Sequence, residues 1–237
     1  MAKCGIASRR HAEEYIRAGR VHINGMIVKD LACQVGDDDI VELDGHVISY
    51  QPEKVYIMMN KPAGVVTTCN DQFGRQSIMD IIGDIGLRVF PVGRLDYNTE
   101  GLLFLTNDGD FAKKFTHPSN QIPKTYIAQL DKEITRQQLE KLCKGVDIHV
   151  TDNKSPIVKT LPAKAEFLDK AYKPAPHFNH SAFISLTITE GRNRQVRKMF
   201  ETLGCRIVKL KRTAVGNLTL GSLKSGQWKQ IKPNLVR

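Results

Sequence analysis

The segment "GRLDYNTEGLLFLT", residues 93–106, places Asp96 directly in front of an apolar run that has the character of a buried strand. Aspartate is depleted in strands and common in turns, so Asp96 could be an ordinary turn residue. A carboxylate at the end of a rigid element could instead act as a covalent nucleophile or as a base that removes a proton. Arg94, two residues earlier, could anchor this loop or contact a ligand.

Two further segments supply partners for such a carboxylate. In "KTYIAQL", Lys124 and Tyr126 are two residues apart, so they share one face of a predicted strand. In "EGRNRQVRKMFETLG", apolar residues recur at helical spacing, and the basic residues off that stripe are Arg194, Arg197 and Lys198. The start of a helix with such basic residues can bind phosphates or a carboxylate. The commoner case, however, is a basic helix that is simply exposed to solvent.

Composition narrows the class of protein. The chain has 237 residues, 41% of them apolar, and a formal net charge of +10, which is typical of proteins that bind nucleic acid. It has no apolar run of about 18 residues and no apolar leader, so we expect a cytoplasmic protein without membrane association. Its five cysteines are scattered and never spaced as C-x-x-C, which predicts reduced thiols and no metal site.

The charge and the turn signals divide the chain. Residues 1–49 carry six basic and eight acidic side chains, so the positive surplus lies in the rest of the chain. Within this front part, Ser8 and Gly19 fit the two ends of a helix, and Asn24-Gly25 predicts a tight hairpin. The segment "YQPEK" that follows has no periodicity and is typical of a linker. We therefore expect a small domain over 1–49 and a larger one over 55–237.

The larger part mixes strands and helices in an irregular order. This order favours an α+β fold with a mixed, largely antiparallel sheet flanked by helices. The patterns predict strands at 55–60, 101–106, 124–130, 181–189 and 206–210, and helices at 110–117, 135–146 and 194–204.

The front segment "SRRHAEEYIRAGRVHINGMIV" resembles the S-four-like (α-L) RNA-binding domain. Members of that family usually begin several residues earlier, so we expect an incomplete N-terminus. The alternative is a solvated helix with ordinary surface arginines. The resemblance implies that RNA phosphates are contacted by Arg9, Arg10, Arg17 and Arg20.

The rear segments, from "NKPAGVVTT" through "GRLDYNTEGLLFLTNDG" and "KTY" to "GRNRQVRKMF", resemble the RsuA/RluB-type ribosomal RNA pseudouridine synthases. The resemblance implies isomerisation of uridine to pseudouridine without a cofactor, in 23S rather than 16S ribosomal RNA. It implies a monomer that acts on ribosomal RNA or on an assembly intermediate. It assigns the catalytic aspartate to Asp96 and further active-site positions to Tyr126, Arg197 and Leu210.

These assignments imply particular roles. Arg197, if it pairs with Asp96, favours the ionised carboxylate and fixes its direction. Tyr126 offers a flat face to a flipped-out uracil and a hydroxyl for a hydrogen bond. Whether Asp96 attacks the substrate or removes a sugar proton stays open. The substrate-binding residues we expect are Arg94, Lys124, Arg192, Arg194, Lys198 and Leu210.

Two other classes of function compete with this interpretation. A non-catalytic RNA-binding or ribosome-assembly factor could keep the fold, but it would not need all three catalytic residues. A glycoside hydrolase requires two paired carboxylates, and the motifs supply one. Asp108 and Asp110 fit a turn and an N-cap. His177 and His180 are spaced like metal ligands but have no evident third ligand, so we interpret them as part of a loop.

Overall fold

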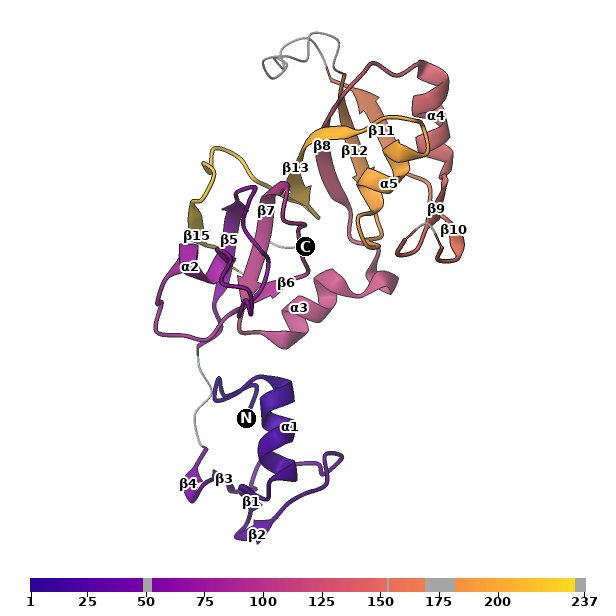
Figure 1. Cartoon of the computed structure of the whole chain (residues 1–237). Helices are drawn as coiled ribbons and strands as arrows, with labels where there is room; N and C mark the ends of the chain where they lie inside the picture. Colours follow the sequence, from indigo (N-terminus) through magenta and orange to yellow (C-terminus); the bar gives the residue numbers. More distant parts are fainter. Residues whose placement is uncertain (49–52, 153, 169–181, 233–237) are drawn as a thin grey trace. The chain divides into compact units, whose positions relative to one another are not determined.

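The computed structural model describes residues 1–48, 53–152, 154–168 and 182–232. Contacts between residues divide the chain into two compact units (Figure 1). The smaller unit comprises Met1–Val55, Asp84–Val89 and Asn107–Gly109, and the larger one comprises Tyr56–Gly83, Phe90–Thr106 and Asp110–Arg237. Within the described ranges no helix is long and apolar enough to cross a membrane.

The smaller unit opens on the helix that the sequence predicts. Helix α1 spans Arg9–Arg17, and the Ser8 side chain accepts a hydrogen bond from the His11 amide at 3.1 Å. This bond satisfies one of the amides that a helix start leaves without a partner. Gly19, just beyond the C-cap residue Ala18, has φ +69°, the left-handed conformation that ends many helices.

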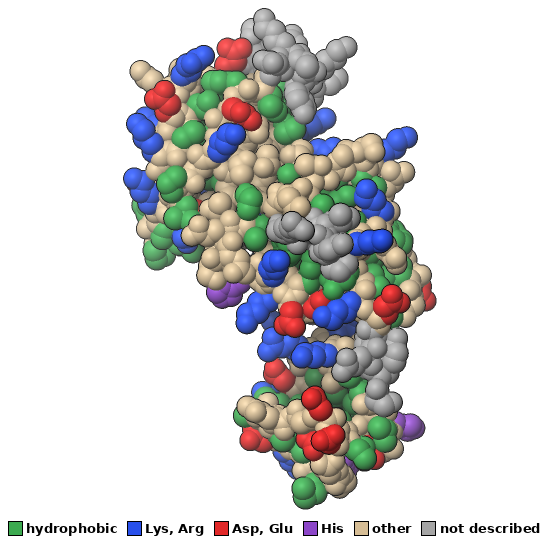
Figure 2. Space-filling model, turned by 180° about the vertical axis from the view of Figure 1, so that it is seen from behind, with side chains coloured by type: hydrophobic (Ala, Val, Ile, Leu, Met, Phe, Trp, Pro, Cys, Tyr) green, Lys and Arg blue, Asp and Glu red, His purple; other side chains and the backbone are tan. Residues whose placement is uncertain are grey.

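Two hairpins complete the smaller unit, in the sheet order β2-β1-β3-β4. Asn24-Gly25, both at positive φ, joins β1 (Val21–Ile23) to β2 (Met26–Ile27), as predicted. Asp44-Gly45 makes the same kind of turn between β3 (Val41–Leu43) and β4 (His46–Val47). Both residues of β2 are exposed, and Figure 2 shows hydrophobic side chains at the surface of this unit. So short a unit buries little core.

The larger unit is built on a nine-stranded sheet in which the order β11-β12-β8-β13-β7-β5-β15 forms the main path. The pairing of β13 with β7 is parallel, and the other strand pairs of the sheet are antiparallel. The α+β fold with a mixed, largely antiparallel sheet is therefore confirmed. The strands are β5 (Tyr56–Lys61), β6 (Phe90–Val92), β7 (Thr99–Thr106), β8 (Lys124–Leu130), β11 (Lys164–Phe167), β12 (Phe183–Ile188), β13 (Ile207–Val215), β14 (Leu218–Thr219) and β15 (Trp228–Gln230).

The sequence patterns of these strands follow their place in the sheet. Strand β5, which pairs with β7 on one side and β15 on the other, is buried at every position, as expected of an interior strand covered on both faces. Strand β12 alternates between half-buried and buried residues, as a strand covered on one face does. A separate two-stranded sheet pairs β9 (Asp147–His149) with β10 (Ile157–Lys159).

Helices cover the larger sheet. They are α2 (Ile78–Ile82), α3 (Gly109–Thr116), the 3₁₀ helix η1 (Pro118–Asn120), α4 (Arg136–Lys144) and α5 (Gln195–Glu201). Helix α3 packs Phe111 and Phe115 against Tyr56 and Phe104, with the Tyr56 and Phe111 rings 4.8 Å apart. This aromatic cluster fixes α3 on β5 and β7.

The structure corrects two predictions about helix ends. Helix α5 is shorter than the predicted 194–204, because Arg194 at φ 50° is left-handed and Glu201 is the last helical residue. Asp110 lies in the first turn of α3 and is not the residue before the helix. Sequence patterns locate helix interiors better than helix ends, which depend on local hydrogen bonds.

Gly101 determines how closely β7 and β13 approach. It pairs with Arg212 in the parallel register, and its φ is +114°. A Cβ at this position would lie 2.1 Å from the Arg212 carbonyl oxygen, so only glycine fits. This close parallel pairing brings the start of β7 beside the middle of β13, where Leu210 pairs with Thr99.

Candidate active site

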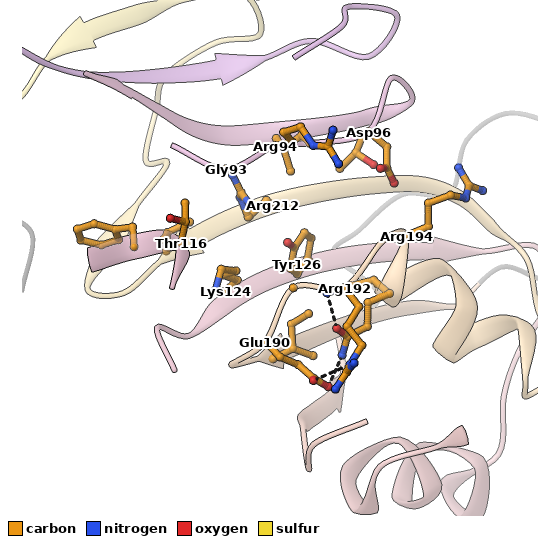
Figure 3. A pocket seen from close by; sticks show the side chains of 18 of the residues that line it. Gly93, Arg94, Asp96, Thr116, Lys124, Tyr126, Glu190, Arg192, Arg194 and Arg212 are labelled. Carbon is orange, nitrogen blue, oxygen red and sulfur yellow. Dashed lines mark hydrogen bonds and ion pairs between the residues drawn. The ribbon is translucent and has the colours of Figure 1, made fainter. Parts of the chain in front are cut away.

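A cavity of about 190 Å³ opens beside the parallel strand pair (Figure 3). The turn between β6 and β7, the first residues of β8, the segment between β12 and α5, and the middle of β13 all contribute to its walls. The structure brings together eight of the nine residues expected from the sequence to bind or convert the substrate in the larger domain: Arg94, Asp96, Lys124, Tyr126, Arg192, Arg194, Arg197 and Leu210.

Lys198 does not join this set. Its ammonium group donates a hydrogen bond to the Val150 carbonyl oxygen at 2.9 Å, and it does not line the cavity. The helical pattern placed Lys198 next to Arg197, but successive helix residues point about 100° apart. Arg197 therefore faces the cavity and Lys198 faces β9 and the residues after it.

Asp96 lies in the turn between β6 and β7, and its backbone carbonyl accepts a hydrogen bond from the Thr99 amide at 3.0 Å. Its carboxylate is 35% exposed, so a ligand in the cavity can reach it. Figure 3 shows the Asp96 side chain close to Arg94 and Arg194 at the same end of the cavity. The interpretation as a turn residue is therefore correct and compatible with a chemical role.

Arg197 supports the Asp96 turn from α5. Its Nε lies 4.0 Å from Asp96 Oδ2 and has no hydrogen-bond partner in the described part of the chain. Its Nη2 donates to the Asn98 carbonyl oxygen at 2.9 Å. Burial lowers the pKa of Arg197, the nearby Arg194 lowers it further, and Asp96 raises it. The guanidinium thus presents a positive charge to the carboxylate while it holds the turn in place.

Lys61, which the sequence analysis did not single out, lies under the same turn. It is fully buried at the end of β5. Its ammonium group donates to the carbonyl oxygens of Pro62 at 2.8 Å, Thr99 at 3.1 Å and Tyr97 at 3.4 Å. Burial lowers the pKa of Lys61 to about 8, against the raising effect of Asp96 and Glu100. A cation so placed ties both sides of the Asp96 turn to β5.

Tyr126 and Leu210 belong to the apolar part of the cavity wall. Tyr126 is 8% exposed and Leu210 is 4% exposed, and they stand on the neighbouring strands β8 and β13. In Figure 3 Tyr126 lies in the middle of the cavity, between the Asp96 end and the Lys124 end. A flat ring beside an aliphatic side chain is the type of surface on which a pyrimidine base packs.

The other end of the cavity is cationic. Arg212, which pairs with Tyr126 across the β8 and β13 register, is 5% exposed and donates its Nε to the Leu102 carbonyl oxygen at 2.8 Å. Lys124 lies nearby, and burial followed by the charge of Arg212 lowers its pKa. Arg212 was missed in the sequence, although its position two residues after Leu210 places both on one strand face.

Glu190 organises the segment that carries Arg192. Its carboxylate accepts hydrogen bonds from Gln195 Nε2 at 2.6 Å and from Arg192 Nε at 3.0 Å (Figure 3). It also accepts a hydrogen bond from the Leu161 amide at 2.8 Å. The Arg192 guanidinium is therefore already paired with the Glu190 carboxylate. Arg94 and Arg194 are exposed and form no ion pair with any described residue, so their charges are available to a ligand.

The four arginines of the smaller unit are not equivalent. The Arg20 guanidinium makes two hydrogen bonds to the Asp44 carboxylate and lies 4.5 Å from the Tyr15 ring centre. These bonds hold the pKa of Asp44 below its usual range. Arg17 lies 3.9 Å from Glu13, whereas Arg9 and Arg10 are exposed and form no ion pair within the described ranges.

His177 and His180 lie outside the described residues. Among the residues that are described, no group of three or more histidine, cysteine or acidic side chains could hold a metal ion.

The sheet with its parallel β7·β13 pair, and the cavity that joins an aspartate, an arginine and a buried tyrosine, are those expected of a pseudouridine synthase. The chain belongs to the RNA pseudouridylate synthase family, whose model matches residues 55–202, and residues 1–41 match the model of the S4 domain. The resemblance drawn from the sequence motifs is therefore confirmed.

Relatives match over nearly the whole chain. The ribosomal large subunit pseudouridine synthase B of Bacillus subtilis is 40% identical over 237 residues, which is 100% of this chain and 92% of that protein. The dual-specificity RNA pseudouridine synthase RluF of Escherichia coli is 35% identical over 233 residues, which is 98% of this chain and 73% of that protein. A pseudouridylate synthase of known crystal structure is 30% identical in sequence, and its structure matches with a TM-score of 0.67. The match covers 98% of this chain and 94% of that chain.

Proposed function

We propose that the protein isomerises one or a few uridines to pseudouridine in ribosomal RNA, in the 23S rather than the 16S molecule, as a cytoplasmic monomer. One observation carries the proposal: a cavity that places the Asp96 carboxylate 4.0 Å from the Arg197 guanidinium, with Tyr126 in the same wall. The likeness to a protein named for the large ribosomal subunit supports the choice of RNA.

The reaction needs no group donor and no redox change. The bond from C1′ of the ribose to N1 of uracil breaks, the base turns, and a new bond joins C1′ to C5. C5 loses a proton and N1 gains one, so atoms and electrons balance within the nucleotide. In this proposal Asp96 acts on the flipped-out nucleotide, either as a nucleophile or as the base that removes a sugar proton. Both routes require the ionised carboxylate that Arg197 favours.

The cavity suits the other parts of a nucleotide. Tyr126 and Leu210 would pack against the uracil, and the cationic end formed by Lys124 and Arg212 would take a phosphate of the same strand. Arg94 and Arg194 are exposed near Asp96 and would contact the neighbouring backbone. These contacts would offset the few kcal/mol that extraction of the base from its stack costs.

A non-catalytic RNA-binding factor is the competing function. It would need the cationic surface but would have no use for a carboxylate, a guanidinium and a buried tyrosine in one cavity. A glycoside hydrolase would need a second carboxylate within about 10 Å of Asp96. Glu190, the other acid in the cavity wall, is already occupied by Gln195, Arg192 and the Leu161 amide.

The proposed function is tested by mapping pseudouridines in both ribosomal RNAs from cells with and without the gene. We expect the loss of one or a few pseudouridines from 23S RNA and no change in 16S RNA. The purified protein, added to unmodified 23S transcript and separately to partly assembled large subunits, would show which of the two is the substrate. Unchanged pseudouridines in both ribosomal RNAs would contradict the proposal.

The arginines of the smaller unit lead to a prediction about salt dependence. The double variant Arg9→Gln, Arg10→Gln should bind ribosomal RNA more weakly, with a salt slope reduced by about two, because each lost phosphate contact releases about one fewer counterion. Arg20→Gln should keep the wild-type slope but melt at a lower temperature, since Arg20 is bonded to Asp44. Affinity measured from about 50 to 200 mM salt, with thermal melts, separates the two. An unchanged slope in the double variant would show that α1 does not contact phosphates.

A further inference from the structure

The loop between β5 and α2 exposes an aromatic side chain that the fold does not use. Phe73 is 79% exposed, the highest value among the large hydrophobic residues that the structure describes. Its position is a turn in which Gly74 has φ +68° and has no atom near its missing Cβ. A phenylalanine held in water forfeits the stabilisation that burial would give. Packing within the domain therefore does not explain its presence.

The tip of this loop is nonetheless held together by hydrogen bonds. The Asp71 carboxylate accepts hydrogen bonds from the Phe73 amide at 3.1 Å, from the Arg75 amide at 2.8 Å and from Arg75 Nη2 at 2.7 Å. The bonds from Arg75 lower the pKa of Asp71 to about 2, so the carboxylate stays ionised at neutral pH. The Arg75 guanidinium in turn lies 5.1 Å from the Phe73 ring centre. A ring fixed in this way loses little conformational freedom when it binds a ligand.

The neck of the loop is joined to the turn that carries Asp96. Thr67 Oγ1 donates to the Leu95 carbonyl oxygen at 2.7 Å and accepts from the Leu95 amide at 3.3 Å. The Gly64 amide donates to the Tyr97 carbonyl oxygen at 2.9 Å. Asp96 is the residue between these two bonded positions, so the loop and the candidate active site are parts of one bonded scaffold.

Tyr97 extends the aromatic surface from that turn toward the loop. It is 49% exposed and follows Asp96 directly. A Cβ at Gly64, in the neck of the loop, would lie 3.9 Å from the Tyr97 hydroxyl, so the Tyr97 side chain reaches the loop. Neither Phe73 nor Tyr97 lines the cavity of Figure 3. Tyr97 follows Asp96 in the chain, and Phe73 lies at the tip of the loop whose neck is bonded to the Asp96 turn.

We propose that Phe73, held by Arg75 and Asp71, is a stacking platform for an unpaired nucleobase of the RNA next to the target uridine. The proposal rests on the proposed function, because flipping a uridine into the cavity leaves its neighbour without a stacking partner. An exposed ring stacks with any base, and a guanidinium plane beside it suits the adjoining nucleotide. The platform replaces the lost stacking and contributes affinity that does not depend on charge.

The test compares Phe73→Ala, Phe73→Trp and the matched control Phe167→Ala, which removes another exposed phenylalanine of the same unit. The probe is an unmodified 23S ribosomal RNA transcript, and affinity is measured from about 50 to 200 mM salt. We expect Phe73→Ala to raise Kd about tenfold at each salt concentration, with an unchanged salt slope, because stacking releases no counterions. Phe73→Trp should bind at least as tightly as wild type, and Phe167→Ala should be unchanged.

The rate at saturating protein separates this site from the catalytic residues. Single-turnover pseudouridine formation by Phe73→Ala should stay within about twofold of wild type once the RNA is fully bound. A wild-type Kd for Phe73→Ala, an equal loss in Phe167→Ala, or a changed salt slope would each overturn the proposal. Failure of the proposed function would appear differently, as wild-type protein that binds the transcript but forms no pseudouridine.

Discussion

The Asp96→Asn variant is expected to form no measurable pseudouridine, a loss of at least about 10³-fold in the single-turnover rate. An amide neither attacks carbon nor takes a proton at neutral pH, so both routes open to the carboxylate are closed. Asparagine has nearly the same volume as aspartate. It leaves the bonds from Lys61 and Arg197 to the backbone of the turn intact. RNA affinity should therefore stay within about threefold of wild type.

Asp110→Asn is the matched control for this variant. It makes the same chemical change on an exposed residue in the first turn of α3, in the same unit. We expect full activity in this control. The helix should lose a little stability, because a negative charge in its first turn interacts favourably with the helix dipole. Pseudouridine formation in Asp96→Asn at a rate near that of wild type would show that Asp96 is not catalytic. A loss of RNA binding in Asp96→Asn would show instead that the residue positions the substrate.

The second large effect is expected at Lys61, which does not touch the cavity. Lys61→Met removes the ammonium group that holds the carbonyl oxygens of Pro62, Tyr97 and Thr99. Buried carbonyl groups without donors are costly, so the Asp96 turn should rearrange. A displacement of about 1 Å at a reacting group can cost about 100-fold in rate, and we expect a fall of that size in pseudouridine formation.

Lys229→Met serves as the control, because it removes an exposed lysine from β15, the strand that pairs with β5. Wild-type activity in Lys229→Met beside the loss in Lys61→Met would assign the effect to the buried charge. Equal activity in Lys61→Met and wild type would show that the turn holds its shape without the lysine.

The pH dependence of stability gives an independent check on Lys61. Its pKa is about 8 in the folded chain, and we take the ordinary lysine value of 10.5 for the unfolded chain. Below pH 8 both states are protonated, and the folded state bears the full cost of a buried charge. Between pH 8 and 10.5 the unfolded chain binds more protons, so the free energy of unfolding rises with pH, by about 3 kcal/mol in total. The free energy of unfolding of Lys61→Met is measured over the same pH range and subtracted from that of the wild type. The difference removes the contribution of the other titratable groups.

Local patterns were sufficient to predict much of this protein. The capped helix, the Asn24-Gly25 hairpin, the central strands and the three segments that carry Asp96, Tyr126 and Arg197 follow from turn chemistry and hydrophobic period. The short edge strands β11 and β15 were missed, because four and three mostly exposed residues give no periodic signal. The start of α5 was misplaced, because Arg194 is left-handed and lies between Arg192 and Gln195, which are both bonded to the Glu190 carboxylate.

The sequence by itself therefore determined the fold class and the residues that could do chemistry. Only the tertiary structure decided which of them share a cavity, because Asp96, Tyr126 and Arg197 meet through the parallel pairing of β7 with β13, a contact between distant segments. It also showed that Lys198 and Arg20 are bonded to neighbours. Lys61 and Arg212 proved to be buried cations, Lys61 under the Asp96 turn and Arg212 in the cavity wall. Burial and the distance between charges depend on what packs around a side chain, and the spacing of residues along the chain does not report them.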